Sequence, residues 1–139
     1  MSDKPKIGFY WCASCGGCEE SIVDLAEDLL MLAGKIEIVF WPVAMDFKKS
    51  DIEAMPDGSI AATFINGAVR TSEQAEMAHL LRRKSQIIVA YGACAQLGGI
   101  PSLANQFSRE DIFRYVYQDA PTAENPDNRL PAEEYNDQG

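Results

Sequence analysis

Three cysteines at three-residue intervals near the start of the chain are the residues best suited to chemistry. They are Cys12, Cys15 and Cys18, in the segment WCASCGGC. The remaining cysteine, Cys94, lies in a second glycine-rich segment, YGACAQLGG. Each segment follows a strand-like apolar run, and an open α/β sheet binds its ligands at the carboxyl ends of its parallel strands. Four thiols that converge there indicate an inorganic cluster or a metal ion, and hence a function in electron transfer.

The spacing of these thiols leaves three kinds of site open. In C-x-x-C, two thiolates leave one tight loop, and Gly16 and Gly17 remove side chains where the backbone must wrap a bulky ligand. Free amide groups in such a loop favour a negatively charged iron–sulfur cluster. Tetrahedral zinc also accepts four thiolates, although the pairing here is three plus one. A thioredoxin-like thiol–disulfide site is the third interpretation, but it has no need of Cys94.

Composition sets the broad class of the protein. The chain has 139 residues, of which 47% are hydrophobic and 24% are charged, as in a globular domain with a real core. A net charge of −9 argues against nucleic acid or an anionic membrane as a partner. With neither an apolar signal core nor a run of about 20 apolar residues, we expect a cytoplasmic protein without membrane spans. In a reducing cytosol, closely spaced cysteines indicate metal binding or catalysis before a disulfide.

The apolar pattern alternates between strands and helices, which predicts βαβ units and a mostly parallel sheet. Thr71 with Gln74 forms a predicted capping box, and the last strand is expected to be fully buried. From residue 119 onward the periodicity fails, and an irregular segment is expected. The expected strands are 6–11, 35–42, 59–65 and 85–91, and the expected helices are 20–33, 71–84 and 108–118.

Both cysteine segments resemble motifs of [NiFe]-hydrogenase small subunits, in the same order. The segment CGGCEES, residues 15–21, looks like the proximal-cluster motif of that family, and GACAQLGGIP, residues 92–101, looks like its second motif. The stretches 40–46 and 66–70 are also similar. Across residues 6–107 the resemblance is greatest to the small (gamma) subunits of cytoplasmic methyl-viologen-reducing and deazaflavin-reducing hydrogenases.

This resemblance implies a fold, a cofactor and partners. The fold would be a flavodoxin-like three-layer α/β sandwich over residues 1–118, followed by an irregular and truncated C-terminal segment, 119–139. The domain would carry one [4Fe–4S] cluster and dock against a [NiFe]-hydrogenase-type large subunit that holds the catalytic metal site. It would pass electrons to further iron–sulfur or heterodisulfide reductase-like subunits, as the electron-transfer part of an oxidoreductase.

The resemblance also assigns the site residues. Cys15, Cys18 and Cys94 match cluster ligands, whereas the family's fourth ligand belongs to a later G-C-P motif that this chain lacks. Either the chain is a fragment, or Cys12, an extra cysteine relative to the family, is the fourth ligand. Glu20 matches an acid of the family and is a candidate for a proton path, although an acid at a helix start also simply complements the helix dipole.

Two further functions remain open. A small iron–sulfur subunit of a complex I-like quinone oxidoreductase is related, but its motif has adjacent cysteines that are absent here. A zinc-stabilised binding module would use the same thiols without redox activity. Metal analysis distinguishes this module from an iron–sulfur protein.

Overall fold

The computed structural model describes residues 4–132, and the chain divides after Pro101 into two compact units. The first unit holds all four strands and all four cysteines. The second consists of helical turns, namely η1 (Pro101–Gln106, which begins at the boundary), α6 (Arg109–Arg114) and η2 (Tyr115–Asp119). The expected division into 1–118 and 119–139 stays a prediction. No helix within residues 4–132 has the length and apolar character needed to cross a membrane.

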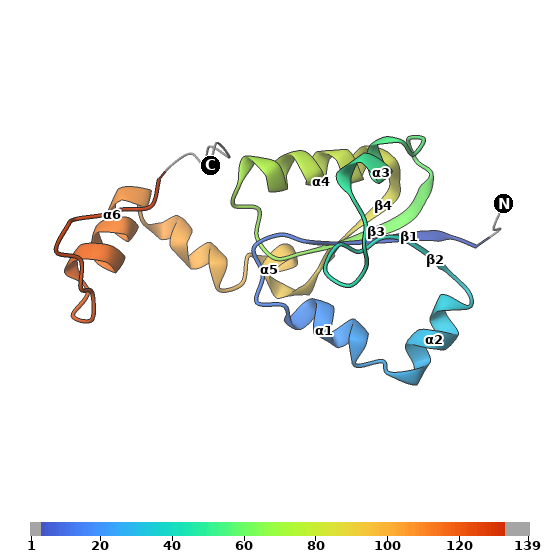
Figure 1. The fold of residues 1–139 in the computed structure, drawn as a ribbon, viewed down its shortest axis with the longest axis horizontal. Helices are drawn as coiled ribbons and strands as arrows, with labels where there is room; N and C mark the ends of the chain where they lie inside the picture. The colour runs from blue at the N-terminus through green and yellow to red at the C-terminus, as the bar shows by residue number, and fades with distance from the viewer. Residues whose placement is uncertain (1–3, 133–139) are drawn as a thin grey trace. The chain divides into compact units, whose positions relative to one another are not determined.

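A four-stranded parallel sheet organises the first unit (Figure 1). Its strands are β1 (Lys6–Trp11), β2 (Glu37–Phe40), β3 (Ile60–Asn66) and β4 (Ser85–Tyr91), in the order β2-β1-β3-β4. This strand order is that of flavodoxin-like folds, so the expected fold class is confirmed. The ends of three strands are level, because Trp11 pairs with Asn66 and Asn66 pairs with Tyr91.

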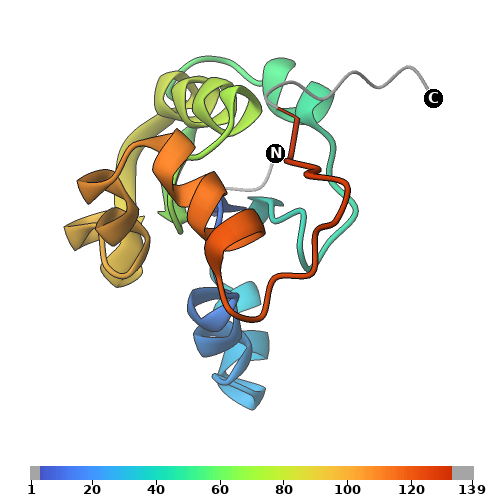
Figure 2. The ribbon, with the colours of Figure 1, turned by 90° about the vertical axis from the view of Figure 1, so that its left-hand side faces the viewer.

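Helices cover both faces of the sheet, which makes three layers (Figures 1 and 2). On one face, α3 (Lys49–Glu53) and α4 (Ser72–Lys84) enclose a core that includes Phe40, Ile60 and Leu81. On the other face, α1 (Gly17–Val23) and α2 (Glu27–Ala33) pack over a smaller core of Phe9, Ile22 and Trp41. The sheet is therefore sandwiched between two separate apolar clusters.

The predicted capping box at the start of α4 is confirmed. Thr71 Oγ1 accepts a hydrogen bond from the backbone N–H of Gln74 at 3.2 Å, and Gln74 Oε1 accepts from the backbone N–H of Thr71 at 3.3 Å. Two donors of the first turn are thereby satisfied, which is why the helix begins where the sequence indicates.

The single helix expected over 20–33 is wrong, because the segment forms two helices with a break between them. Ala26 in this break has φ +48°, a left-handed value that interrupts the helix. Before it, the hydrogen bonds tighten to i→i−3, from Leu25 N–H to Ile22 O and from Ala26 N–H to Val23 O. Neither Gly nor Pro lies in the break, so the local sequence carries no signal for it.

The fully buried last strand is also wrong. In β4, Ile87 is 59% exposed, and only Ser85 is buried. The reason lies in the strand order, since β4 forms one edge of the sheet. A continuous apolar run predicts a strand, but its burial depends on neighbours that the run itself does not specify.

Candidate metal centre

Two loops leave the sheet at the same edge and carry the thiols. After β1, the chain passes through Cys15 into α1, which places Cys18 in the first turn of that helix. After β4, the chain enters α5 (Gly92–Leu97), which carries Cys94. The sequence predicts a glycine-rich turn around Cys94, which instead lies in this short helix. Because β1 and β4 both end at the carboxyl edge, with only β3 between them, the two loops leave the sheet on the same edge.

The loop that carries Cys15 is fixed by neighbouring backbone. Ala13 exchanges two hydrogen bonds with Ala68 in the loop after β3, at 2.9 and 2.8 Å. Trp11 Nε1 donates to the carbonyl of Ser14 at 3.2 Å. Gly16 has φ +92°, and a Cβ there would stand 3.3 Å from the Trp11 ring. The loop is thus shaped by its own tryptophan and by the adjacent loop.

Three of the four thiols come together. Cys15 is exposed, whereas Cys18 and Cys94 are half-buried. Burial raises the pKa of the Cys18 thiol, and the nearby Cys15, Cys94 and Glu19 raise it further, in that order. Cys18 Sγ also donates a weak hydrogen bond to the carbonyl of Tyr91 at 3.8 Å, which joins the two loops directly. The structure therefore groups Cys15, Cys18 and Cys94 at one edge of the sheet.

Glycines keep the space around these sulfurs open. Gly92 has φ +82°, and a Cβ at this position would collide with Cys18 Sγ. Gly99 has φ +50°, and a Cβ there would lie 3.2 Å from Cys94 Sγ. Side chains at either position would fill the space beside the thiols, so the glycines preserve room for a ligand as well as a backbone conformation.

The donor set fits a thiolate-bound cluster in part. Within residues 4–132, no three Cys, His, Asp or Glu side chains already enclose a single metal ion. Iron–sulfur clusters are held by cysteine thiolates and are bulkier than one ion, so their ligands stand further apart than those of zinc. Three thiols from two loops beside two glycines match this requirement, with one ligand position left to be supplied.

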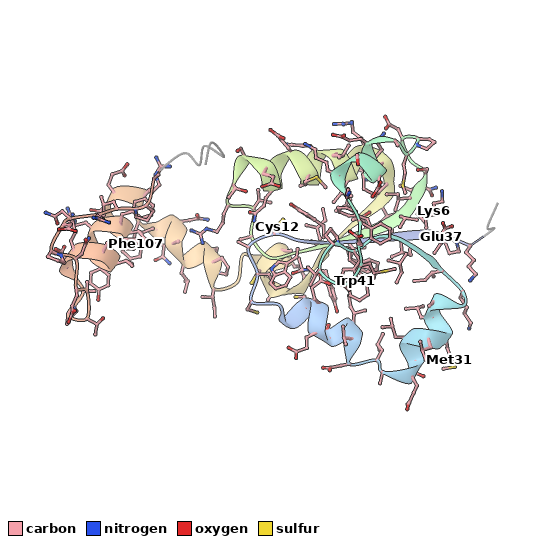
Figure 3. All side chains as sticks on the ribbon, in the orientation of Figure 1. Lys6, Cys12, Met31, Glu37, Trp41 and Phe107 are labelled. Atoms are coloured by element: carbon pink, nitrogen blue, oxygen red, sulfur yellow. The ribbon has the colours of Figure 1, made fainter. Side chains whose placement is uncertain are left out.

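Cys12 lies close to Tyr10, which packs on the core cluster beneath α4, and not with the other three cysteines. Side chains alternate along a strand: Tyr10 packs on the core beneath α4, and Phe9 belongs to the core on the other face, so the alternation continued by one residue puts Cys12 on the side of Tyr10. Desolvation raises the pKa of Tyr10 to about 12, with Cys12 and Glu73 adding to the rise. Cys12 itself is 4% exposed, and burial raises the pKa of its thiol. Figure 3 labels Cys12 at the end of β1. Its role as fourth ligand stays a prediction that this placement does not favour.

Of the two neighbouring acids, Glu19 is the buried one and Glu20 is exposed. Glu19 Oε1 accepts a hydrogen bond from Asn66 Nδ2 at 2.7 Å, and Glu19 Oε2 accepts one from Trp41 Nε1. The motif alone favours Glu20 and does not reveal these three residues as a group. The sequence does contain a clue to this group, because Trp41 and Asn66 each lie where a strand ends, at the edge of the sheet that carries the thiols.

A flavodoxin-like domain with thiols at the carboxyl edge of its sheet defines a class of oxidoreductase subunits. Residues 15–132 match the family model of the 20 kDa subunit of NADH ubiquinone oxidoreductase, and the chain belongs to that family.

Curated relatives in this family are hydrogenase subunits. The iron-sulfur subunit of the F420-non-reducing hydrogenase of Archaeoglobus profundus is 43% identical over 127 residues, which are 91% of this chain and 40% of that protein. The delta subunit of the NAD-reducing hydrogenase HoxS of Cupriavidus necator is 30% identical over 120 residues, which are 86% of this chain and 54% of that protein. The chain thus spans only about half of the length of these relatives.

A solved structure agrees with this assignment. A chain in the crystal structure of an NAD+-reducing [NiFe]-hydrogenase in the H2-reduced state matches with a TM-score of 0.76 and 30% identity. The match covers 94% of this chain and 68% of that chain. The resemblance to hydrogenase small subunits is therefore confirmed in both sequence and fold.

Proposed function

We propose that this chain is the electron-transfer part of a [NiFe]-hydrogenase-like complex. The observation that carries the proposal is the grouping of Cys15, Cys18 and Cys94 at the carboxyl edge of the sheet, beside glycines that keep the space open. Family membership supports it, because the relatives named above are hydrogenase subunits and one is described as an iron-sulfur subunit.

In this proposal, Cys15, Cys18 and Cys94 hold a proximal [4Fe–4S] cluster, which takes up and releases one electron at a time when bound. Cys12 is a structural thiol packed against the α4 face, and the fourth ligand comes from outside residues 4–132. Gly92 and Gly99 maintain the space, and Trp11 holds the Cys15 loop in place. The chain's own residues bind and orient the cluster and make or break no substrate bond.

The partners in this proposal are a large subunit and downstream carriers. The large subunit holds the nickel–iron site, and further iron–sulfur or heterodisulfide reductase-like subunits accept the electrons. Glu20, exposed in the first turn of α1 near Cys18, is positioned to pass protons at the interface with the large subunit. The names of the relatives, which are subunits of hydrogenases, support an assembly of this kind.

A quinone-oxidoreductase subunit is the second candidate, because the family model bears that description. The related motif has adjacent cysteines, and here the residue after Cys15 is Gly16. Gly16 adopts φ +92°, where side chains are strained, and a Cβ would crowd the Trp11 ring at 3.3 Å. The local backbone is thus suited to glycine and not to a second cysteine, which favours the hydrogenase-type subunit.

Metal and sulfide analysis tests the proposal. After anaerobic purification and iron–sulfur reconstitution, the chain is expected to contain about four irons and four acid-labile sulfides and to give a reduced-cluster EPR signal. In the isolated chain a thiol of the reducing agent takes the fourth ligand position, because the proposed fourth ligand lies outside residues 4–132. Cys15→Ser, Cys18→Ser and Cys94→Ser should each lose most of this iron, and Cys12→Ser, the matched control, should keep it.

Two outcomes would contradict the proposal. Stoichiometric zinc without sulfide would indicate the zinc-stabilised binding module. Loss of iron in Cys12→Ser equal to that in Cys18→Ser would make Cys12 a ligand, and the first turn after β1 would then have to rearrange to bring its thiol across the sheet.

A further inference from the structure

A buried carboxylate stands beside the proposed ligands and is held there by neutral donors. Glu19 is 4% exposed, and both of its carboxyl oxygens accept hydrogen bonds from N–H groups, one from Trp41 and one from Asn66 at 2.7 Å. A protonated carboxyl group would have to donate from one oxygen, whereas a carboxylate only accepts. The donor arrangement therefore fits a negative charge at Glu19.

The orientation of Asn66 supports the same conclusion. Its side chain is 1% exposed, and Nδ2 donates to Glu19 and also, at 3.4 Å, to the carbonyl of Tyr10. Its Oδ1 is buried and finds no hydrogen-bond partner within residues 4–132. A buried amide that leaves its own oxygen unpaired is costly, and a charged acceptor on the N–H side offsets this cost.

One helix and two strand ends contribute to this arrangement. Glu19 follows Cys18 directly in α1, Trp41 follows the last residue of β2, and Asn66 ends β3. Figure 3 shows Trp41 on the side of the sheet where α1 lies. Burial, then Cys15 and Cys94, and last the charge of Glu19 raise the pKa of the Cys18 thiol, so the carboxylate lies within electrostatic range of that sulfur.

We propose that Glu19 is a fixed negative charge that lowers the reduction potential of the cluster bound by Cys15, Cys18 and Cys94. This inference rests on the proposed function. Reduction adds one electron to the cluster, and a buried neighbouring charge opposes that electron with little solvent screening. Trp41, after β2, and Asn66, at the end of β3, hold the carboxylate and so keep its distance from Cys18 constant.

The test compares Glu19→Gln with Glu27→Gln, at an exposed glutamate of α2 that has no role in the proposed function. Each reconstituted protein is first analysed for iron and sulfide, and its potential is then measured by an EPR-monitored redox titration. Glu19→Gln keeps the size and an acceptor but removes the charge. We expect the ratio of reduced to oxidised cluster at a fixed applied potential to rise about tenfold, or about 59 mV for a one-electron couple. Glu27→Gln should leave the potential unchanged, because water screens an exposed charge.

Trp41→Phe distinguishes an effect of charge from an effect of structure, because its expected shift in reduction potential is opposite to that of Glu19→Gln. This variant removes the hydrogen bond from Trp41 to Glu19 Oε2, whereas Asn66 still donates to Glu19 Oε1 and holds the carboxylate. The negative charge is then offset by one N–H dipole fewer, so the reduction potential of the cluster should fall. A purely structural role would move the potential of Trp41→Phe and Glu19→Gln in the same direction. Trp41→Phe also keeps the inference testable if Glu19→Gln does not fold.

The results distinguish this inference from the proposed function. A wild-type chain without iron and sulfide after reconstitution would overturn the proposed function itself. A wild-type cluster with an unchanged potential in Glu19→Gln, or a rise in Trp41→Phe, would overturn the role of Glu19 and leave the electron-transfer proposal intact.

Discussion

The two cysteine loops can approach each other because residue 92 is a glycine without a Cβ atom. The absence of a Cβ at Gly92 allows Cys18 Sγ to lie against the backbone at the end of β4, and the weak hydrogen bond to the Tyr91 carbonyl marks the same contact. The thiols of Cys18 and Cys94 share one edge because this position is a glycine. A side chain there would separate the loops and open the site.

Gly92→Ala is expected to lose most of its iron after reconstitution, because the added methyl group occupies the position of Cys18 Sγ. Gly58→Ala is the matched control. Gly58 also has a positive φ, +70° against +82°, but no atom lies within 4 Å of a Cβ there. Both variants should lose about 1–2 kcal/mol of unfolding free energy from the shared backbone strain. Equal iron content in the two would show that the close approach at Gly92 is not needed.

Among the helices, α4 contributes three buried apolar side chains to the core on its face of the sheet, more than α3 does. Met77, Leu80 and Leu81 are buried, and they pack with Phe40 and Ile60 from the strands beneath. Helix α2 differs, because none of its residues is buried. The two layers of the sandwich therefore contribute unequally to stability.

Leu81→Ala is expected to lower the free energy of unfolding by about 2–5 kcal/mol, because a fully buried leucine leaves a cavity. Leu30→Ala in α2 makes the same chemical change at a side chain that is 76% exposed, and it should stay within about 0.5 kcal/mol of wild type. Urea unfolding followed by far-UV circular dichroism measures both. A comparable loss in Leu30→Ala would mean that another surface covers α2.

For the first unit as a whole, one buried lysine joins the end of α4 to the chain before β3. Lys84 is 9% exposed, and its Nζ donates to the carbonyl of Met55 at 2.6 Å and pairs with Asp57 Oδ1 at 2.9 Å. The hydrogen bond from Lys84, and then its charge, lowers the pKa of Asp57 below its ordinary value of 3.8.

This pair predicts how stability depends on pH. A carboxyl group with a lowered folded-state pKa stabilises the fold above pH 3.8 and loses that contribution as the pH falls through the folded value. Asp57→Asn should therefore be less stable than wild type at pH 7, and the difference should shrink below pH 3.8. Asp46→Asn, at another exposed acid, is the control. A difference that persists at about pH 2.5, where carboxylates are largely protonated, would assign the effect to the amide and not to the charge.

The local elements follow from the sequence alone, because their causes are local. The bounds of β1 and the Thr71–Gln74 box follow from short-range patterns, and the same patterns indicate that both cysteine segments come after strands. Periodicity also indicates the parallel α/β class and a helix that begins near residue 108, where the Ser108 hydroxyl accepts from Asp111 N–H at 3.1 Å.

The neighbours that each element meets depend on the tertiary structure. Whether Glu19 or Glu20 is buried depends on the rotation of α1 about its axis, which its contacts with Trp41 and Asn66 set. Whether Cys12 joins the other thiols depends on the face of β1 from which the loop departs, and whether β4 is buried depends on its place at the sheet edge. Local patterns specify conformation, but burial and proximity arise from packing between residues far apart in the chain, which no short pattern contains.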